Sequence, residues 1–203
     1  MKDAVTDYPI QQLLAKRWSP YAFDQRPVSA DDVRSLFEAA RWAASSYNEQ
    51  PWHYLIALKQ QPREFDRMVS CLVEGNQAWA KAAPVLAISV ASVNFKLNGK
   101  PNTAAIHDLG AAACSLTVEA TARGLAVHQM IGILPHRARE LYGIPDGYTA
   151  VTGLAIGYAG DSSTLPERLR PRDLAMRTRK PLHEFVFTGR WQSAWVHNTP
   201  HAG

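Results

Sequence analysis

Arginines stand beside a small hydroxyl residue or beside each other near both ends of the chain, at a spacing that suits an anion. Arg17 and Ser19 lie two positions apart at the end of a short predicted helix, so a guanidinium and a hydroxyl can reach one anionic group. Charge-assisted hydrogen bonds of this kind are each worth about 1.5–3 kcal/mol. Arg177 and Arg179 are also two apart, and alternate side chains of an extended segment point the same way. Both pairs suit a phosphate, although an arginine at a helix end is also common because it complements the helix dipole.

Compact polar side chains gather on a second segment, which we predict to be a turn between a helix and a strand. The segment holds Ser45, Ser46, Asn48 and Gln50, and Pro51-Trp52 follow directly. Short hydroxyl and amide side chains can recognise the edge of a ring or the hydroxyls of a sugar. The residues alone leave a second interpretation open, in which this is only a helix-ending turn in front of a buried tryptophan.

Motifs for several other chemistries are missing from the sequence. It contains no glycine-rich phosphate loop of the dinucleotide-binding or nucleoside-triphosphatase kind, and no Gly-x-Ser-x-Gly nucleophile elbow. Its histidines show no zinc-type spacing, and Cys71 and Cys114 are too isolated for a metal site or a disulfide framework. We therefore predict no metal, and we expect an organic cofactor to carry the difficult electronic step of any reaction.

The net charge of +4 comes from one segment near the C-terminus. Residues 167–180 hold six basic and two acidic side chains, and the rest of the chain has 16 of each. Such a cluster suits nucleic acid, a membrane surface or a phosphorylated ligand, or it is a solvated arm without a ligand. Nucleic acid is disfavoured because the segment has no interleaved aromatic residues on which bases could stack.

Segments that could enter or cross a membrane are not found. The longest stretches without a charged residue have 14 residues, which is too short for a bilayer-spanning helix. Residues 1–25 carry several charges and no apolar run like that of a signal peptide. We therefore expect a cytoplasmic protein without a membrane partner.

The elements that must position these residues follow from hydrophobic periodicity and from helix-ending residues. We predict helices over residues 8–17, 29–44, 63–73, 76–81, 103–123 and 135–142, with Ser29 as an N-cap. We predict strands over 52–58, 85–93, 125–133 and 148–158, and an extended C-terminal arm over about 165–195. Strands and helices do not alternate regularly, which favours an α+β fold with a central, mostly antiparallel sheet packed between helices. No linker divides the chain, so we expect one domain over residues 1–203.

Taken together, the segments resemble the nitroreductase family over about residues 10–190. The resemblance rests on motifs in one order: Arg17–Phe23, Ala44–Trp52, Asn76 before Ala83-Pro84, His107–Gly110 opening a helix that ends at Gly124-Leu125, and Arg177–Leu182. The most specific part is Asn48-x-Gln50-Pro51-Trp52, in register with the flanking motifs.

The resemblance implies an intertwined homodimer that binds FMN at the subunit interface and uses NADH or NADPH as electron donor. FMN would pass hydride to electron-poor small molecules such as nitroaromatics, quinones and enones by a ping-pong mechanism, and no side chain is expected to be catalytic. Arg17, Ser19, Arg177 and Arg179, with the backbone of Trp18, would hold the phosphate and the ring edge. Asn76 would reach the polar edge of the isoalloxazine, and the turn at Ile131-Gly132 would direct a backbone N–H at flavin N5. The partner subunit would supply Ser45, Ser46, Asn48 and Gln50.

The opening motif departs from the family pattern at two positions. Trp18 and Tyr21 stand where basic residues are usual. A lost charge-assisted contact weakens affinity roughly 10- to 150-fold, unless Tyr21 stacks on the cofactor or donates its hydroxyl. Two other functions also remain open. One is a specialised flavoprotein of the same fold, such as a dehalogenase or a flavin destructase, and the other is a non-catalytic flavin-binding protein.

Overall fold

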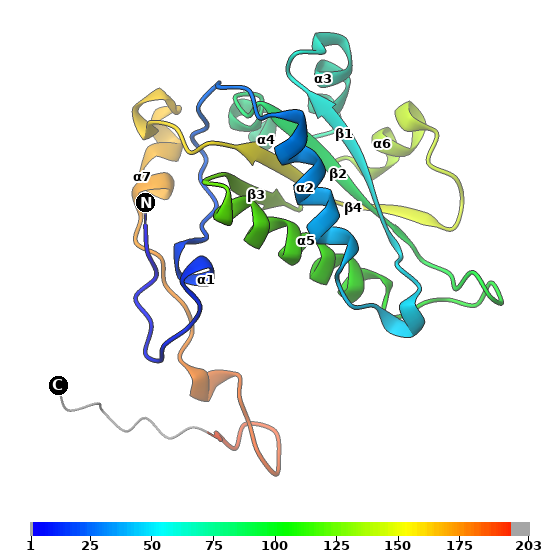
Figure 1. The fold of residues 1–203 in the computed structure, drawn as a ribbon, viewed down its shortest axis with the longest axis vertical. Helices are drawn as coiled ribbons and strands as arrows, with labels where there is room; N and C mark the ends of the chain where they lie inside the picture. The colour runs from blue at the N-terminus through cyan, green and yellow to red at the C-terminus, as the bar shows by residue number, and fades with distance from the viewer. Residues whose placement is uncertain (1, 196–203) are drawn as a thin grey trace.

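The fold is built on a four-stranded sheet in which every neighbouring pair of strands is antiparallel (Figure 1). The structure is a computed structural model that describes residues 2–195, so the segment 196–203 lies outside the described residues. The strands are β1 (Trp52–Leu58), β2 (Val85–Ser92), β3 (Ala126–Met130) and β4 (Tyr148–Gly157), in the spatial order β1-β2-β4-β3. This arrangement confirms the predicted α+β class with a central antiparallel sheet.

The central strand β2 is buried along its whole length, as its uninterrupted run of apolar residues predicts. Val85 and Ala87 pack into the core on one face of the sheet, and Leu86 and Ile88 pack into the core on the other. Successive side chains of a strand point to opposite faces, so one strand supplies both cores.

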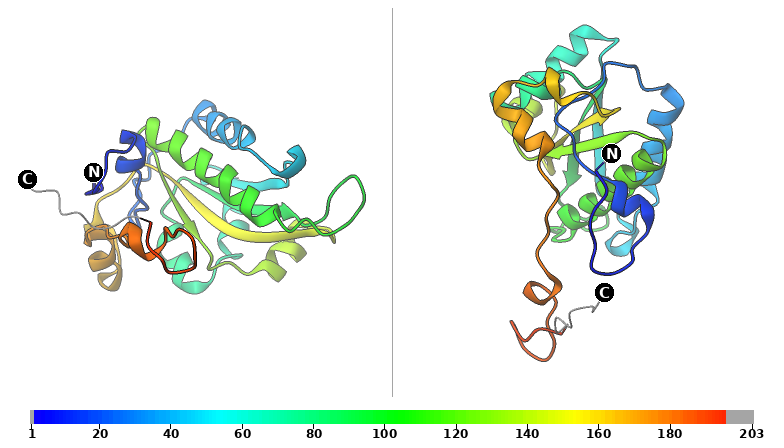
Figure 2. Two further views of the ribbon diagram at one scale, coloured as in Figure 1. Left: turned by 90° about the horizontal axis from the view of Figure 1, so that it is seen from below. Right: turned by 90° about the vertical axis from the view of Figure 1, so that its left-hand side faces the viewer.

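Helices cover both faces of the sheet (Figure 2). On one face lie α2 (Ala30–Arg41) and the long α5 (Ala105–Ala122), which pack against each other. On the other face lie α3 (Pro62–Val69), α4 (Glu74–Ala80) and α6 (Pro135–Tyr142). The predicted N-cap is confirmed, because the Ser29 hydroxyl accepts the Asp32 N–H at 3.0 Å.

The remaining elements differ in part from the sequence prediction. The first helix, α1, is confined to Gln12–Lys16, and β3 ends at Met130 because the chain then turns, with the Ile133 N–H donating to the Ile131 carbonyl. The C-terminal segment is not extended throughout. It contains 3₁₀ turns at Ser162–Thr164, Glu167–Leu169 and Leu182–Glu184, and the short helix α7 (Arg170–Leu174). Pro171 lies in the first turn of α7, where its fixed φ and missing N–H are tolerated.

After α7 the chain leaves the body of the molecule and runs beside the N-terminal segment (Figure 1). Hydrogen bonds join the two segments: the Lys2 ammonium donates to the Ala175 carbonyl at 3.2 Å, and the Arg177 guanidinium donates to the Lys2 carbonyl at 2.9 Å. Within residues 2–195, the helices are all too short or too polar to span a membrane.

Candidate functional site

The arginines predicted to bind phosphate come together in one cavity, although they lie at opposite ends of the sequence. Arg17 follows α1, and Arg177 and Arg179 follow α7. All three line a cavity of about 980 Å³, together with Lys180 and apolar side chains from both ends of the described chain. None of the three forms an ion pair with a carboxylate of residues 2–195. The cavity therefore offers clustered positive charge to a ligand.

The electrostatics of the cluster indicate an uncompensated site. Burial lowers the pKa of Arg17, and the neighbouring charges of Arg177 and Arg179 lower it further. Burial and the charge of Arg179 likewise lower the pKa of Arg177, which Asp3 offsets only in part. The Arg177 Nε is buried and has no hydrogen-bond partner within the described chain. An anion in the cavity would relieve the repulsion and could accept the unused N–H.

The guanidiniums are held by contacts with the N-terminal part of the chain. Arg17 Nη1 donates to the Ser19 hydroxyl at 3.1 Å, as their spacing allows. Arg177 Nη1 donates to the carbonyls of Lys2 and Ala15, at 2.9 and 2.5 Å. The Trp18 ring lies under the Lys2 ammonium at 5.1 Å from its centroid. Arg179 is exposed, and within the described residues its one hydrogen bond goes to the adjacent Thr178 carbonyl, at 2.6 Å.

A buried carboxylate that the sequence analysis did not single out joins the two halves of this arginine cluster. Asp173, in α7, is 2 % exposed. It accepts the Tyr21 N–H at 2.6 Å, the Ala22 N–H at 3.4 Å and the Ser162 hydroxyl at 2.5 Å. It thereby ties the Arg17–Tyr21 segment to the helix that precedes Arg177. The one signal in the sequence for this role is that Asp173 is an acidic residue inside a tract of arginines.

Tyr21, which replaces a basic residue of the family pattern, packs into an aromatic cluster. Its ring makes edge contacts with Trp79 and His128, at centroid distances of 5.1 and 4.7 Å. Burial lowers the pKa of His128, and its Nδ1 lies 2.8 Å from the Pro20 carbonyl. Tyr21 is not among the residues that line the arginine cavity, so its predicted contact with a cofactor stays a prediction.

Asn76 and Gly132, two other predicted site residues, lie together on the face of the sheet that α4 covers. The Asn76 side-chain amide donates to the Gly132 carbonyl at 2.9 Å, and the Asn76 side-chain oxygen accepts the Trp79 indole N–H at 3.3 Å. A Cβ at Gly132 would lie 2.4 Å from Asn76 Nδ2, so only glycine permits this approach. The preceding Ile131 is 86 % exposed, which leaves the turn accessible.

The polar turn at residues 45–50 has an unusual backbone. Tyr47, Asn48 and Gln50 have φ values of 53°, 54° and 50°, in the left-handed region that non-glycine residues rarely adopt. Local hydrogen bonds hold this geometry, since the Gln50 N–H donates to the Ser45 hydroxyl at 3.0 Å. Strained turns of this kind occur often at functional sites.

The polar turn and the arginine cluster lie near opposite ends of α5. The Ser46 N–H donates to the carboxylate of Asp108, in the first turn of α5, at 2.9 Å. Arg17 lines a smaller cavity with Thr121 and Gly124 at the other end of the helix. The 13 positions between Asp108 and Thr121 span about 20 Å of helix. One chain therefore does not bring the two predicted halves of the site together.

Comparisons with known proteins identify the family of the chain. The model of the Nitroreductase family matches residues 14–158. A solved structure described as an oxidoreductase containing FMN superimposes with a TM-score of 0.88 at 36 % identity, covering 93 % of this chain and 96 % of that one. A protein of Archaeoglobus fulgidus, provisionally named an NADH dehydrogenase/NAD(P)H nitroreductase, is 26 % identical over 77 % of this chain and 88 % of its own length. A 15.4 kDa protein of Mycolicibacterium smegmatis is 37 % identical over 63 % of this chain and 84 % of its own.

The class that the fold and these matches define is that of the oxidoreductases. The chain belongs to the nitroreductase family.

Proposed function

We propose that this chain is an FMN-dependent oxidoreductase that takes hydride from NADH or NADPH and passes it to electron-poor small molecules, in two alternating half-reactions. FMN would supply the redox chemistry when bound, and the protein would supply binding, orientation and a preorganised electrostatic environment. The observation that carries the proposal is the convergence of Arg17, Arg177 and Arg179 on one cavity.

The chemistry of the cavity fits the phosphate of FMN. A phosphate near neutral pH carries between one and two negative charges and several acceptor oxygens, which suit a cluster of guanidiniums. The unpartnered Nε of Arg177 supplies a buried donor, and the hydroxyl of Ser19 lies beside Arg17. Three of the six basic residues of the segment 167–180, namely Arg177, Arg179 and Lys180, line this cavity and would serve this one ligand.

The separation of the polar turn from the arginines supports a homodimer with shared sites. In a two-fold dimer that packs α5 against the α5 of its partner in antiparallel orientation, the turn of each subunit lies near the arginine cluster of the other. Ile106, Gly110 and Cys114 form an exposed stripe along α5 at a spacing of four residues. A Cβ added to Gly110 would meet nothing within 4 Å, so this face can accept a neighbouring helix closely.

The rest of the predicted site would position the flavin ring. Asn76 fixes the Ile131-Gly132 turn through the Gly132 carbonyl, which leaves the turn rigid where a backbone N–H is proposed to face the ring. In the other subunit, Ser45, Ser46, Asn48 and Gln50 would contact the ring or the ribityl chain. The loop that follows β2 is short, with the Phe95 N–H donating to the Lys100 carbonyl at 2.8 Å, and this favours an open pocket and a broad choice of acceptors.

Anaerobic titration tests the proposal. The purified protein is reconstituted with FMN, and NADH or NADPH is then added while the visible absorbance of the flavin is followed. We expect saturable binding of one FMN per chain, loss of the visible band with one or both donors, and its return on addition of a nitroaromatic or a quinone.

Two outcomes would contradict the reductase proposal. If FMN binds and neither donor bleaches it, the chain is a flavin-binding protein without this activity. If reduced flavin is broken down by oxygen in the presence of the protein, a destructase is the better description.

Sedimentation tests the proposed dimer separately. Gly110→Arg places a large charged side chain on the outer face of α5, and we expect it to convert a dimer into monomers that bind FMN poorly. His136→Arg, at an exposed position of α6 on the other face of the sheet, is the control. A wild-type monomer that binds FMN fully would show that the shared-site arrangement is wrong.

A further inference from the structure

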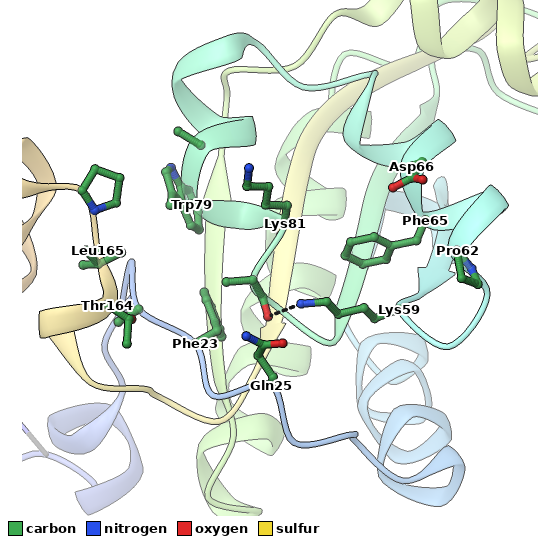
Figure 3. A pocket seen from close by; sticks show the side chains of 14 residues that line it. Phe23, Gln25, Lys59, Pro62, Phe65, Asp66, Trp79, Lys81, Thr164 and Leu165 are labelled. Carbon is green, nitrogen blue, oxygen red and sulfur yellow. Dashed lines mark hydrogen bonds between the residues drawn. The ribbon is translucent and has the colours of Figure 1, made fainter.

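Asp108 is a buried carboxylate that none of the proposed flavin contacts uses. Within residues 2–195 two aspartates are buried, Asp108 and Asp173, and Asp173 belongs to the arginine cluster. Asp66 is exposed and lines a separate cavity of about 540 Å³, which shares no lining residue with the arginine cavity (Figure 3). Asp108 lies in the first turn of α5, at the end of the helix beside the polar turn (Figure 1). It is therefore the buried acidic group in the polar-turn half of the proposed site.

Both carboxylate oxygens of Asp108 have partners. Oδ2 accepts the Ser46 N–H at 2.9 Å, and Oδ1 lies 3.1 Å from Nδ1 of His107. The His107 side chain is 85 % exposed, so water can replace it as a partner. The bond to Ser46 is a backbone N–H donating to a carboxylate, which is one of the stronger kinds of hydrogen bond in proteins.

The conformation of the polar turn comes from bonds within the turn. Tyr47 and Asn48 have left-handed φ values, which non-glycine residues keep only where the surrounding structure holds them. The Asn48 N–H donates to the Ser45 carbonyl at 3.1 Å, and the Gln50 N–H donates to the Ser45 hydroxyl at 3.0 Å. These bonds fix the backbone of the turn, but they do not place the turn relative to α5.

Two hydrogen bonds connect the polar turn to other parts of the described chain. The Lys96 N–H donates to the Glu49 carboxylate at 2.7 Å, but Lys96 lies in an exposed loop. The Ser46 N–H donates to Asp108, in a long helix that packs against α2 and the sheet. The bond to Asp108 is the firmer of the two, because its acceptor is buried and belongs to a packed helix.

This connection is made to the helix that we propose as the dimer interface. Ile106 and Gly110, on either side of Asp108 in the sequence, belong to the exposed stripe of α5. In the proposed dimer, contact along this stripe fixes where the partner subunit lies. A bond between the polar turn and the first turn of α5 therefore also fixes how far the turn lies from the arginine cluster of the other subunit.

We propose that Asp108 is a positioning residue for the flavin. It holds the polar turn of one subunit where Ser46 and Asn48 contact the ring or the ribityl chain of the FMN whose phosphate is bound by the arginines of the other subunit. Asp108 itself does not touch the flavin and acts through the Ser46 N–H. This inference rests on the proposed function and on the proposed dimer.

Affinity for FMN tests the inference. Asp108→Ala should raise the dissociation constant of FMN about tenfold, because the turn no longer presents its donors and acceptors in one place. The dependence of this constant on salt concentration should stay that of the wild type, since the variant keeps the phosphate contacts. Arg177→Ala should instead reduce the dependence on salt. Fluorescence quenching of FMN measures all of these constants.

Two variants of the same hydrogen-bonded group are the controls. Asp108→Asn keeps an oxygen for the Ser46 N–H and should recover most of the affinity. His107→Ala removes the exposed partner of the carboxylate and should bind FMN like the wild type. The melting temperature of each variant without FMN separates lost binding from lost folding.

Mixed dimers test whether Asp108 acts on the flavin of the other subunit. Asp108→Ala and Arg177→Ala chains with different tags are expressed together, and the heterodimer is isolated. One of its two sites combines the intact arginines of one chain with the intact turn of the other. We therefore expect one FMN per heterodimer with wild-type affinity, although both homodimers bind FMN weakly.

Three results would overturn the inference: wild-type affinity in Asp108→Ala, a loss in Asp108→Asn or His107→Ala as large as that in Asp108→Ala, or a heterodimer without a tight site. The second result would mean that charge matters and not position. Failure of the proposed function is a different outcome, because the wild type would then bind no FMN, or its flavin would not be bleached by NADH or NADPH.

Discussion

The arginine cluster and the polar turn are each bonded to a buried aspartate. The two aspartates differ in how far along the sequence their hydrogen-bond partners lie. Asp173 is 2 % exposed and bonds to Tyr21, 152 positions away in the sequence. Asp108 is 3 % exposed and holds the Ser46 N–H, 62 positions away. Asp173 accepts three donors from two segments, whereas the second partner of Asp108 is the neighbouring His107, whose side chain is 85 % exposed.

This difference between the two aspartates indicates how ligand binding and folding stability are coupled in the arginine cluster and in the polar turn. The arginine cluster forms where the two terminal segments are tied together, so loss of the contacts that tie them should weaken both folding and the proposed phosphate binding. The polar turn has one bond to Asp108 and is otherwise held by hydrogen bonds within the turn, so a change within the turn should affect a proposed ligand more than the fold. Four predictions test this contrast.

The largest effect is expected from removing the carboxylate of Asp173. Asp173→Ala leaves two backbone N–H groups and a hydroxyl without their acceptor, and we expect a loss of roughly 3 kcal/mol or more in the free energy of unfolding. Asp108→Ala should cost about 1–2 kcal/mol, because one of its two partners can turn to water. Urea denaturation measures both. Glu167→Ala, an exposed acidic residue near α7, is the control. A larger loss in Asp108→Ala would reverse the comparison.

Next in size is the loss of an arginine that faces the proposed phosphate. Arg177→Ala should raise the dissociation constant of FMN about 10- to 150-fold and also lower stability, since Arg177 bonds to two carbonyls of the N-terminal part. Arg179→Ala should weaken FMN with little change in stability, because its one hydrogen bond is to its neighbour. Fluorescence quenching of FMN gives the affinities. Arg172→Ala, exposed on α7, should behave like the wild type, and a similar loss there would mean a nonspecific charge effect.

A smaller, pH-dependent effect is expected from His128 beside Tyr21. Burial lowers its pKa in the folded state below the ordinary value of 6.5, so the unfolded chain binds the proton more readily. Stability should therefore be complete above pH 6.5 and fall as the pH drops from there toward the folded pKa, by at most about 1.4 kcal/mol per pH unit. His128→Gln should flatten this part of the profile, and His136→Gln, which is exposed, should not. Equal profiles for all three proteins would show that the burial of His128 is unimportant.

The smallest effect is expected at the polar turn. Tyr47 is 91 % exposed and has a φ of 53°, so Tyr47→Gly should relieve backbone strain and offset the greater freedom of glycine in the unfolded chain. The free energy of unfolding should change by less than about 1 kcal/mol. Leu97→Gly, equally exposed but outside the left-handed region, should be mildly destabilising. A large loss of stability in Tyr47→Gly would mean that the turn is not held locally.

Much of the fold was predictable because secondary structure depends on short-range patterns. The residues of β1 and α6 lie within the bounds that periodicity predicts, and Ser29 caps α2 as its spacing with Asp32 indicates. The buried run of β2 was visible from composition alone. The family resemblance came from motifs of a few residues each, which are also local, and it was confirmed by the match over residues 14–158.

The features that the sequence did not predict depend on contacts between segments that are distant in the sequence. Nothing near Asp173 in the sequence indicates that it accepts the N–H groups of Tyr21 and Ala22, and α7 forms where an extended arm was expected. The aromatic cluster of Tyr21 and the arginine cavity likewise need distant segments to meet. Local propensity gives each segment its shape, but a buried hydrogen bond or a cavity wall depends on which segments the fold brings together, and only the tertiary structure determines that.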